Sequence, residues 1–201
     1  MEKKIEENYQ ENVYLSDNNK NENLNNNEKN IKFKLKMKII NKKNDENEIK
    51  KIKNLYYSAF PKNELINFDI FFSKNDFKGK KIFAFFDQTI FVGFAIIITK
   101  LKISNILYLA IESELRGKGY GTQVLKNISN FYQNNRIVVD VEDPDKTEIN
   151  KDERLKRIKF YLNAGFKLTN IKYFWEGEYY IIMVSNGDIT EIEFWNFWKN
   201  R

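Results

Sequence analysis

From residue 35 onward the chain carries apolar positions at two spacings, one typical of strands and one of helices. Continuous or alternating apolar runs predict strands at residues 35–40, 81–86, 90–99, 105–111, 136–142, 172–175 and 179–185. Recurrence every three or four positions predicts four helical faces: Ile49, Ile52, Leu55 and Tyr56; Val124, Leu125, Ile128 and Phe131; Leu155, Ile158, Tyr161 and Leu162; and Ile192, Trp195 and Trp198. The predicted element order is β-α-β-β-β-α-β-α-β-β-α.

Capping and turn residues set the bounds of these elements. Polar pairs three residues apart predict three helix starts: Asp45 with Glu48, Asn150 with Glu153, and Asp188 with Glu191. Pro61 and Gly165 are expected to end the first and third helices, and Gly93 indicates a bulge or a close backbone approach within a strand. We expect an α/β (α+β) fold, in which a mixed sheet has antiparallel hairpin strands first and parallel strands later, with helices on both faces.

Residues 1–34 have a different composition, dominated by Asn, Lys and Glu, with no apolar period. Such a segment buries too little apolar surface to offset the entropy lost on ordering. The sequence therefore predicts a disordered tail over residues 1–34 and a single domain over residues 35–201.

Composition narrows the chemistry. The chain has no His and no Cys, which excludes disulfides, thiol nucleophiles and thiolate or imidazole metal sites, so we expect no metal. The formal net charge is +6, but the basic residues form no concentrated block, and we expect no nucleic-acid partner. With no apolar run of membrane-spanning length and no signal-peptide core at the N-terminus, we expect no membrane association and a cytoplasmic location.

A glycine-rich turn, Leu-Arg-Gly-Lys-Gly-Tyr-Gly-Thr at residues 115–122, joins a predicted strand to a predicted helix. Glycine allows a ligand to approach the backbone closely, and the first N–H groups of a helix favour anions such as phosphate. A mononucleotide loop would need Gly-Lys-Ser/Thr, whereas Lys118 precedes Gly119. A dinucleotide site is the other alternative, because Asp140 follows at the usual distance, but Thr122 stands where its third glycine belongs.

Two motifs identify a resemblance. Residues 116–121, Arg-Gly-Lys-Gly-Tyr-Gly, resemble the Arg/Gln-x-x-Gly-x-Gly/Ala signature of the GNAT superfamily of acyl-CoA-dependent N-acyltransferases. Residues 160–166, Phe-Tyr-Leu-Asn-Ala-Gly-Phe, are similar to the family's Phe-Tyr-x-x-x-Gly-Phe. The resemblance covers about residues 37–184 and implies a GNAT-like sheet with a V-shaped splay between the strand ending at Ile111 and the one ending near Glu142.

The resemblance implies that acetyl-CoA enters this splay. Backbone N–H groups of the glycine turn would bind its pyrophosphate, while the backbones of Ala110 and Ile111 would pair with the pantetheine arm, and one of their N–H groups could face the developing oxyanion. Asn150 lies where some members contact the cofactor. The cofactor-binding residues implied are Ala110, Ile111, Arg116, Gly117, Lys118, Gly119, Tyr120, Gly121, Thr122 and Asn150.

The resemblance also implies direct attack of an amine on the thioester. Tyr161 occupies the position that donates a proton to the departing thiolate. The strand before the turn carries Asn105 where some members have a Glu, so the candidate bases are Glu142, Glu64 or a water relay.

The expected function is acetyl transfer to a primary amine of a small molecule. A protein N-terminus or lysine is the alternative acceptor, and a non-catalytic acyl-CoA-binding sensor is the alternative class. The aromatic cluster of Trp195, Phe197 and Trp198 is expected in the core, with a homodimer contact or an acceptor-site wall as the other interpretations.

Overall fold

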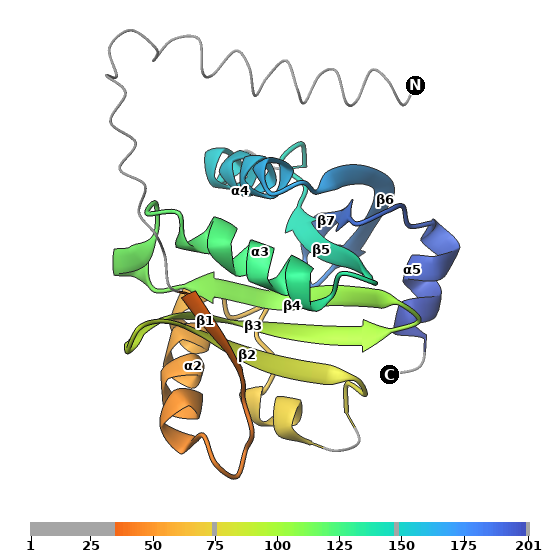
Figure 1. Ribbon diagram of the computed structural model, residues 1–201. Coiled ribbons are helices and arrows are strands. Elements are labelled where there is room, and N and C mark those ends of the chain that lie inside the picture. Colours follow the sequence, from red (N-terminus) through yellow and green to blue (C-terminus); the bar gives the residue numbers. More distant parts are fainter. Residues whose placement is uncertain (1–34, 74–75, 147–148, 200–201) are drawn as a thin grey trace, which may run out of the picture. The chain divides into compact units, whose positions relative to one another are not determined.

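The computed structural model describes residues 35–73, 76–146 and 149–199, all within one unit of the chain, Phe33–Arg201 (Figure 1). Its strands are β1 Leu35–Ile39, β2 Lys80–Asp87, β3 Ile90–Lys100, β4 Ile103–Ile111, β5 Arg136–Glu142, β6 Lys167–Trp175 and β7 Glu178–Ser185. Its helices are α2 Glu46–Ala59, α3 Tyr120–Phe131, α4 Lys151–Asn163 and α5 Glu191–Trp198, with short 3₁₀ helices η1 Phe68–Phe72 and η2 Ser113–Leu115. The predicted element order is confirmed, and η1 and η2 are additional.

The seven strands form one mixed sheet in the order β1-β2-β3-β4-β5-β7-β6. The pairs from β1 to β4 are antiparallel, β4 and β5 are parallel, and β5-β7-β6 are antiparallel again. The parallel pair is joined through α3, as a crossover connection requires. The α/β fold class with a mixed sheet and helices on both faces is confirmed.

Alternating side chains of β2 to β4 supply both faces of the first half of the sheet. On one face, Tyr56 of α2 and Phe68 of η1 are fully buried with Phe94 and Ile96 of β3. On the other face, Phe83 of β2 packs edge-on against two aromatic residues at the end of α3. Figure 1 shows α2 below the sheet and α3 and α4 above it. Burial on both faces explains the nearly continuous apolar sequence of these strands.

A second apolar cluster lies where α5 meets β3, β5 and β7. Phe194 and Phe197 are each only 1% exposed and pack with Val138 and Ile182. The predicted face of this helix is therefore wrong: Ile192 is 74% exposed, because the buried positions are shifted to Phe194 and Phe197. With aromatic or aliphatic residues all round the helix, periodicity could not determine which face packs.

The predicted helix starts near Asp45, Asn150 and Asp188 are close to the observed ones, but the side-chain caps differ. The Asp45 carboxylate accepts from the Asn41 N–H at 2.7 Å and ion-pairs with Lys38 at 2.7 Å instead of capping α2. Asn150 is left-handed, with φ 54°, and also forms no side-chain cap. The last helix begins with a capping box between Thr190 and Glu193. Contacts with Asn41 and Lys38 thus engage the Asp45 carboxylate, and Thr190 with Glu193 caps the last helix in place of Asp188 with Glu191.

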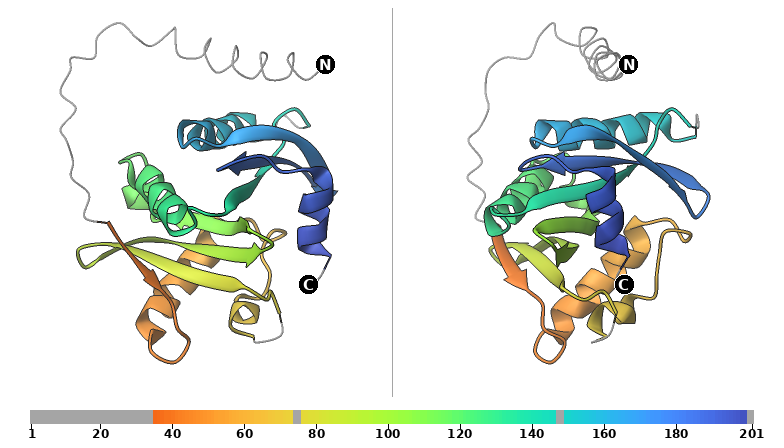
Figure 2. Two further views of the ribbon diagram at one scale, coloured as in Figure 1. Left: turned by 45° about the vertical axis from the view of Figure 1, so that its right-hand side comes forward. Right: turned by 90° about the vertical axis from the view of Figure 1, so that its right-hand side faces the viewer.

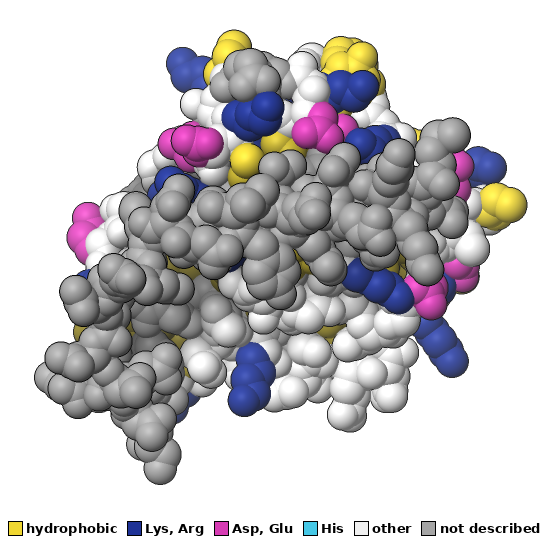
Figure 3. All heavy atoms as spheres, turned by 90° about the horizontal axis from the view of Figure 1, so that it is seen from above, with side chains coloured by type: hydrophobic (Ala, Val, Ile, Leu, Met, Phe, Trp, Pro, Cys, Tyr) yellow, Lys and Arg dark blue, Asp and Glu magenta, His cyan; other side chains and the backbone are white. Residues whose placement is uncertain are grey.

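The remaining predictions concern the chain as a whole. The tail of residues 1–34 lies outside the described residues, so its predicted disorder stays a prediction, as does the domain boundary. Among the described residues, no helix is long and apolar enough to span a membrane. On the face that Figure 3 shows, the coloured basic side chains stand among acidic ones and do not gather into one patch.

Candidate active site

A bulge in β4 separates the two halves of the sheet. Ile97 of β3 pairs with Ile106 and Ile96 pairs with Tyr108, so Leu107 is an extra residue in β4. The parallel pairing of β4 with β5 runs only from Ile103 to Ile106 and stops immediately before this bulge. Because a bulge bends and twists its strand, β4 leaves β5 at Leu107. Figure 2 shows the two halves of the sheet diverging on this side.

The divergence leaves one edge of β4, from Leu107 to Ile111, without a strand partner. Gly93 lies opposite Ile111 so closely that a Cβ on Gly93 would stand 2.1 Å from the Ala110 carbonyl oxygen. The Glu112 N–H donates to Val92 on the β3 side. Since backbone groups alternate along a strand, the Ile111 N–H points to the open edge. This edge therefore offers backbone groups for pairing with an extended amide-containing ligand.

The glycine turn closes one end of this edge. Gly119 is the N-cap of α3 in the left-handed conformation, with φ 85°, and Gly117 has φ 71°. The Arg116 Nε donates to the Ile111 carbonyl at 3.0 Å, which ties the turn to the end of β4. A Cβ on Gly121 would lie 3.0 Å from the Phe160 ring, so glycine allows α3 and α4 to pack closely there. The first turn of α3 presents backbone N–H groups of the kind that bind anions.

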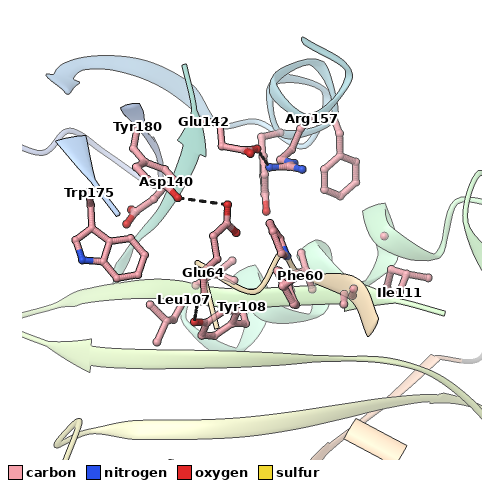
Figure 4. A pocket seen from close by; sticks show the side chains of 18 of the residues that line it. Phe60, Glu64, Leu107, Tyr108, Ile111, Asp140, Glu142, Arg157, Trp175 and Tyr180 are labelled. Carbon is pink, nitrogen blue, oxygen red and sulfur yellow. Dashed lines mark hydrogen bonds and ion pairs between the residues drawn. The ribbon is translucent and has the colours of Figure 1, made fainter. Parts of the chain in front are cut away.

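The open edge, the turn and the end of β5 line one cavity of about 830 Å³ (Figure 4). Such a volume is typical of a small-molecule site. In Figure 4, Ile111 and Trp175 lie at opposite ends of the view, with the Glu64 side chain between them. Of the residues predicted from the sequence, the cavity is lined by Glu64, Ala110, Ile111, Arg116, Gly117, Gly119, Gly121, Thr122, Glu142 and Tyr161.

Glu64 reaches the cavity from the loop between α2 and η1, and two buried tyrosines hold that loop. The Tyr108 hydroxyl donates to the Glu64 carbonyl oxygen at 2.5 Å, while the Tyr56 hydroxyl donates to the Ile66 carbonyl oxygen at 2.9 Å. The Glu64 carboxylate accepts from the Tyr180 hydroxyl at 3.3 Å. Burial, and secondarily the charge of Glu142, raises the pKa of Glu64 above the usual 4.5. A carboxylate whose ionised form is disfavoured in this way accepts protons readily.

Glu142 has different surroundings. Its carboxylate forms an ion pair with Arg157 and lies 3.9 Å from the guanidinium of Arg154, which is only 4% exposed. Arg154 also pairs with Glu178 at 3.0 Å, so the group links β5, α4 and β7. The Glu142 carboxylate is therefore engaged by two guanidinium groups.

Asp140 is also committed to other side chains. Its two oxygens accept from the Asn105 amide at 3.1 Å and from the Tyr173 hydroxyl at 2.8 Å. Asn105 is 1% exposed, and its side chain connects β4 to β5 on the paired side of the bulge. Asp140 and Asn105 therefore hold the base of the splay together.

Tyr161 lines the cavity from α4, near Arg157 one turn earlier. It is 9% exposed, and burial raises its pKa to about 12, with Arg157 lowering and Asp140 raising the value by smaller amounts. The hydroxyl therefore stays protonated at neutral pH and can donate a proton into the cavity. Its ring packs against Phe160 and Phe166, so the Tyr161 side chain has apolar surroundings.

Three predicted residues have side chains outside the cavity lining. The Tyr120 hydroxyl donates to Asp87 at 2.8 Å, which fastens α3 to the β2-β3 hairpin. Lys118 is exposed, and Asn150 lies at the start of α4. The sequence also missed cavity residues that no motif marks: Phe60, Leu107, Tyr108, Arg157, Tyr173, Trp175 and Tyr180. Leu107 and Tyr108 precede Ala110 in the same strand, and Arg157 lies one turn before Tyr161. The other four become neighbours of the site only through pairing of distant segments.

The sequence comparison agrees with this geometry. The family model described as an acetyltransferase (GNAT) domain matches residues 70–168, which include β4, the glycine turn and α4. This chain belongs to the GNAT superfamily. A comparison with curated proteins gives no match.

Solved structures show the same GNAT fold. A putative GNAT-family acetyltransferase from Bacteroides thetaiotaomicron is similar at 21% identity and TM-score 0.67, over 80% of this chain and 92% of that one. The ribosomal-protein-S18-alanine N-acetyltransferase from Escherichia coli matches at 15% identity and TM-score 0.55, over 78% and 97%. An acetyltransferase from Bacillus subtilis in complex with CoA matches at 14% identity and TM-score 0.53, over 78% and 100%. The superfamily and fold assign acetyl transfer to this domain in general terms.

Proposed function

We propose that this GNAT domain transfers an acetyl group from acetyl-CoA to the primary amine of a small molecule, by direct attack of the amine. The observation that carries the proposal is the convergence of an open β4 edge, a glycine turn and the Glu64 and Tyr161 side chains on one cavity. Family membership and the CoA-bound Bacillus subtilis neighbour support the choice of donor.

The residues around the splay fit an acyl-CoA. The left-handed Gly119 and the N–H groups at the start of α3 suit a pyrophosphate, with Arg116 beside them. The open edge of β4 suits the amide groups of a pantetheine arm, and the Ile111 N–H is the donor directed toward a thioester carbonyl. Bound acetyl-CoA would supply an acyl group already activated as a thioester.

Glu64 is the proposed general base. An amine must be neutral to attack, and a carboxylate with a raised pKa can take its proton. Glu142 is the weaker candidate, because its carboxylate is already engaged by Arg157 and Arg154. Glu64 takes one proton from the bound ammonium ion, which leaves the neutral amine. As the new C–N bond forms and the C–S bond breaks, the nitrogen loses a second proton, which replaces the one that Tyr161 gives to the sulfur.

Tyr161 is the proposed general acid. Its hydroxyl is protonated at neutral pH and would donate its proton to the sulfur that leaves as the C–S bond breaks. Proton transfer from such a positioned group typically contributes about 10²–10⁴-fold to the rate.

The test is amine-dependent release of CoA thiol, measured for the native chain and for Tyr161→Phe, together with CoA binding by titration calorimetry. We expect turnover by the native chain and a fall in kcat of about 10²-fold or more in the variant, with unchanged CoA affinity. CoA binding without turnover on any amine would support a sensor instead. Turnover unaffected by Tyr161→Phe would remove Tyr161 from the acid role.

A further inference from the structure

The end of the cavity away from the glycine turn has an aromatic wall. It is formed by β6, β7 and α5 and consists of Tyr173, Trp175, Tyr180, Phe194, Trp195 and Trp198. The rings are in contact: Tyr173 stacks on Tyr180 with centroids 5.3 Å apart and meets Trp195 edge-on at 5.8 Å. The ring centroids of Trp175 and Tyr180 are 6.4 Å apart, so Trp175 extends the wall beyond Tyr180 (Figure 4).

The wall leaves largely apolar faces toward the cavity, because three of its polar atoms are engaged elsewhere. The Tyr180 hydroxyl donates to Glu64, and the Tyr173 hydroxyl donates to Asp140. The Trp195 indole N–H donates to Glu191 on the same helix at 3.3 Å. Trp175 and Trp195 nevertheless remain 39% and 37% exposed. A ligand that covers these rings gains chiefly from burying apolar surface.

The charges of the lining fit one ammonium group. Three acidic residues line the cavity: Glu64, Asp140 and Glu142. Glu142 is paired with arginine, and both Asp140 oxygens accept from neutral side chains. Arg157 adds a positive charge to the lining. Glu64, with aromatic rings beside it, is therefore the group best suited to attract a cationic amine. A second ammonium group would meet carboxylates that already have partners, because Glu142 pairs with arginine and Asp140 accepts from Asn105 and Tyr173.

We propose that the acceptor is a monoamine with an aromatic or bulky apolar body, its amine at Glu64 and its body on the aromatic wall, and that Trp195 determines specificity for that body. This inference rests on the proposed function, since it concerns the acceptor of the same reaction. It assigns α5, which lies outside the residues that the family model matches, to substrate selection.

The experiment compares kcat/KM for 2-phenylethylamine, ethylamine, spermidine and an N-acetylated tetrapeptide containing one lysine. Ethylamine offers the same ammonium without the ring. We expect 2-phenylethylamine to exceed each of the others by about tenfold or more, because differences in apolar contact within a pocket give selectivities of roughly 10–200-fold. Equal or better use of ethylamine, spermidine or the peptide would overturn the proposed class.

Trp195→Ala and a matched control, Ile192→Ala, test the wall itself. Ile192 belongs to the same helix but is 74% exposed and does not line the cavity. We expect Trp195→Ala to lower kcat/KM for 2-phenylethylamine about tenfold through KM, with ethylamine changed less than about twofold. Trp195→Phe should recover most of the loss. An equal loss on both amines would indicate a structural role and refute the assignment of Trp195.

Failure of the proposed function would be recognised separately. If no amine is acetylated, direct acetyl transfer is refuted. Titration of the native chain with 2-phenylethylamine and ethylamine still tests whether the aromatic wall binds an amine. Tighter binding of 2-phenylethylamine, weakened by Trp195→Ala but not by Ile192→Ala, would support the aromatic wall as an amine site. Equal binding of the two amines would refute it.

Discussion

Replacement of Glu64 by glutamine should separate activity from stability in this domain. The side chain keeps its length, and its amide oxygen can still accept from the Tyr180 hydroxyl, which lies 3.3 Å from the carboxylate. What it loses is the ability to accept a proton. We expect Glu64→Gln to lower kcat/KM by about 10²–10⁴-fold, the usual contribution of a general base. The residual rate should rise with pH as the free amine becomes neutral without help.

The same substitution should stabilise the fold at neutral pH. Burial raises the folded-state pKa of Glu64 above 4.5, so the folded protein holds this proton more tightly than the unfolded chain does. As pH rises from 4.5 through the folded pKa, ionisation therefore reduces stability, and the full penalty is present above it. Glu64→Gln removes that penalty. We expect a gain on the order of 1 kcal/mol at pH 7.5, or about 2–4 °C in Tm, which vanishes near pH 4.

Glu142→Gln is the matched control. The Glu142 carboxylate is paired with Arg157 and Arg154, and Arg154 is buried, so this substitution should destabilise the fold by about 1–2 kcal/mol. Thermal melts at pH 4 and 7.5, with initial rates over pH 5–9.5, measure both variants. Destabilisation by Glu64→Gln at pH 7.5 would show that ionised Glu64 does not destabilise the fold. A rate loss no greater than that of Glu142→Gln would refute the role of Glu64 as general base.

Two further variants test local features. Gly119→Ala should weaken CoA binding about tenfold or more by calorimetry, because φ 85° disfavours a side chain, whereas Gly165→Ala, at φ 86° on the end of α4, should cost similar stability and leave CoA affinity unchanged. Equal affinities in the two variants would contradict the placement of the pyrophosphate. Thr190→Ala should lower stability by about 1 kcal/mol through loss of the α5 capping box, and an unchanged urea midpoint would show that this cap contributes nothing.

The shape of the glycine turn could be predicted from sequence because short-range features specify it. Three glycines within five residues, between a strand pattern and a helix pattern, determine a backbone shape with little dependence on distant contacts. Gly117 and Gly119 do have positive φ. The order of elements was predictable for a similar reason, since each apolar period is a local property.

The bulge and the acceptor side were less predictable, because they depend on which distant residues meet. Leu107 lies in an unbroken apolar run, and only its register with β3 shows that it is the extra residue. Glu64 was one of three alternatives for the base. Its contacts with Tyr108 and Tyr180, 44 and 116 residues away, are what favour it over Glu142. In α5, aromatic residues lie on several sides of the helix, so periodicity could not show which of them pack in the core and which face the cavity.

The parts of the site are held in place by both local and distant contacts. The glycine turn and the first turn of α3 lie next to each other in the chain, whereas Glu64 is placed by the hydroxyl of Tyr108 on β4, one residue beyond the bulge. The same bulged segment thus opens the edge proposed for the donor and fixes the loop that carries Glu64, the proposed base. The distance between the proposed donor site and Glu64 is therefore set within one short stretch of β4, while the aromatic wall is built on β6, β7 and α5. Changes in the wall at residues other than Tyr180, which contacts Glu64, are therefore expected to alter the proposed acceptor without moving the reacting groups.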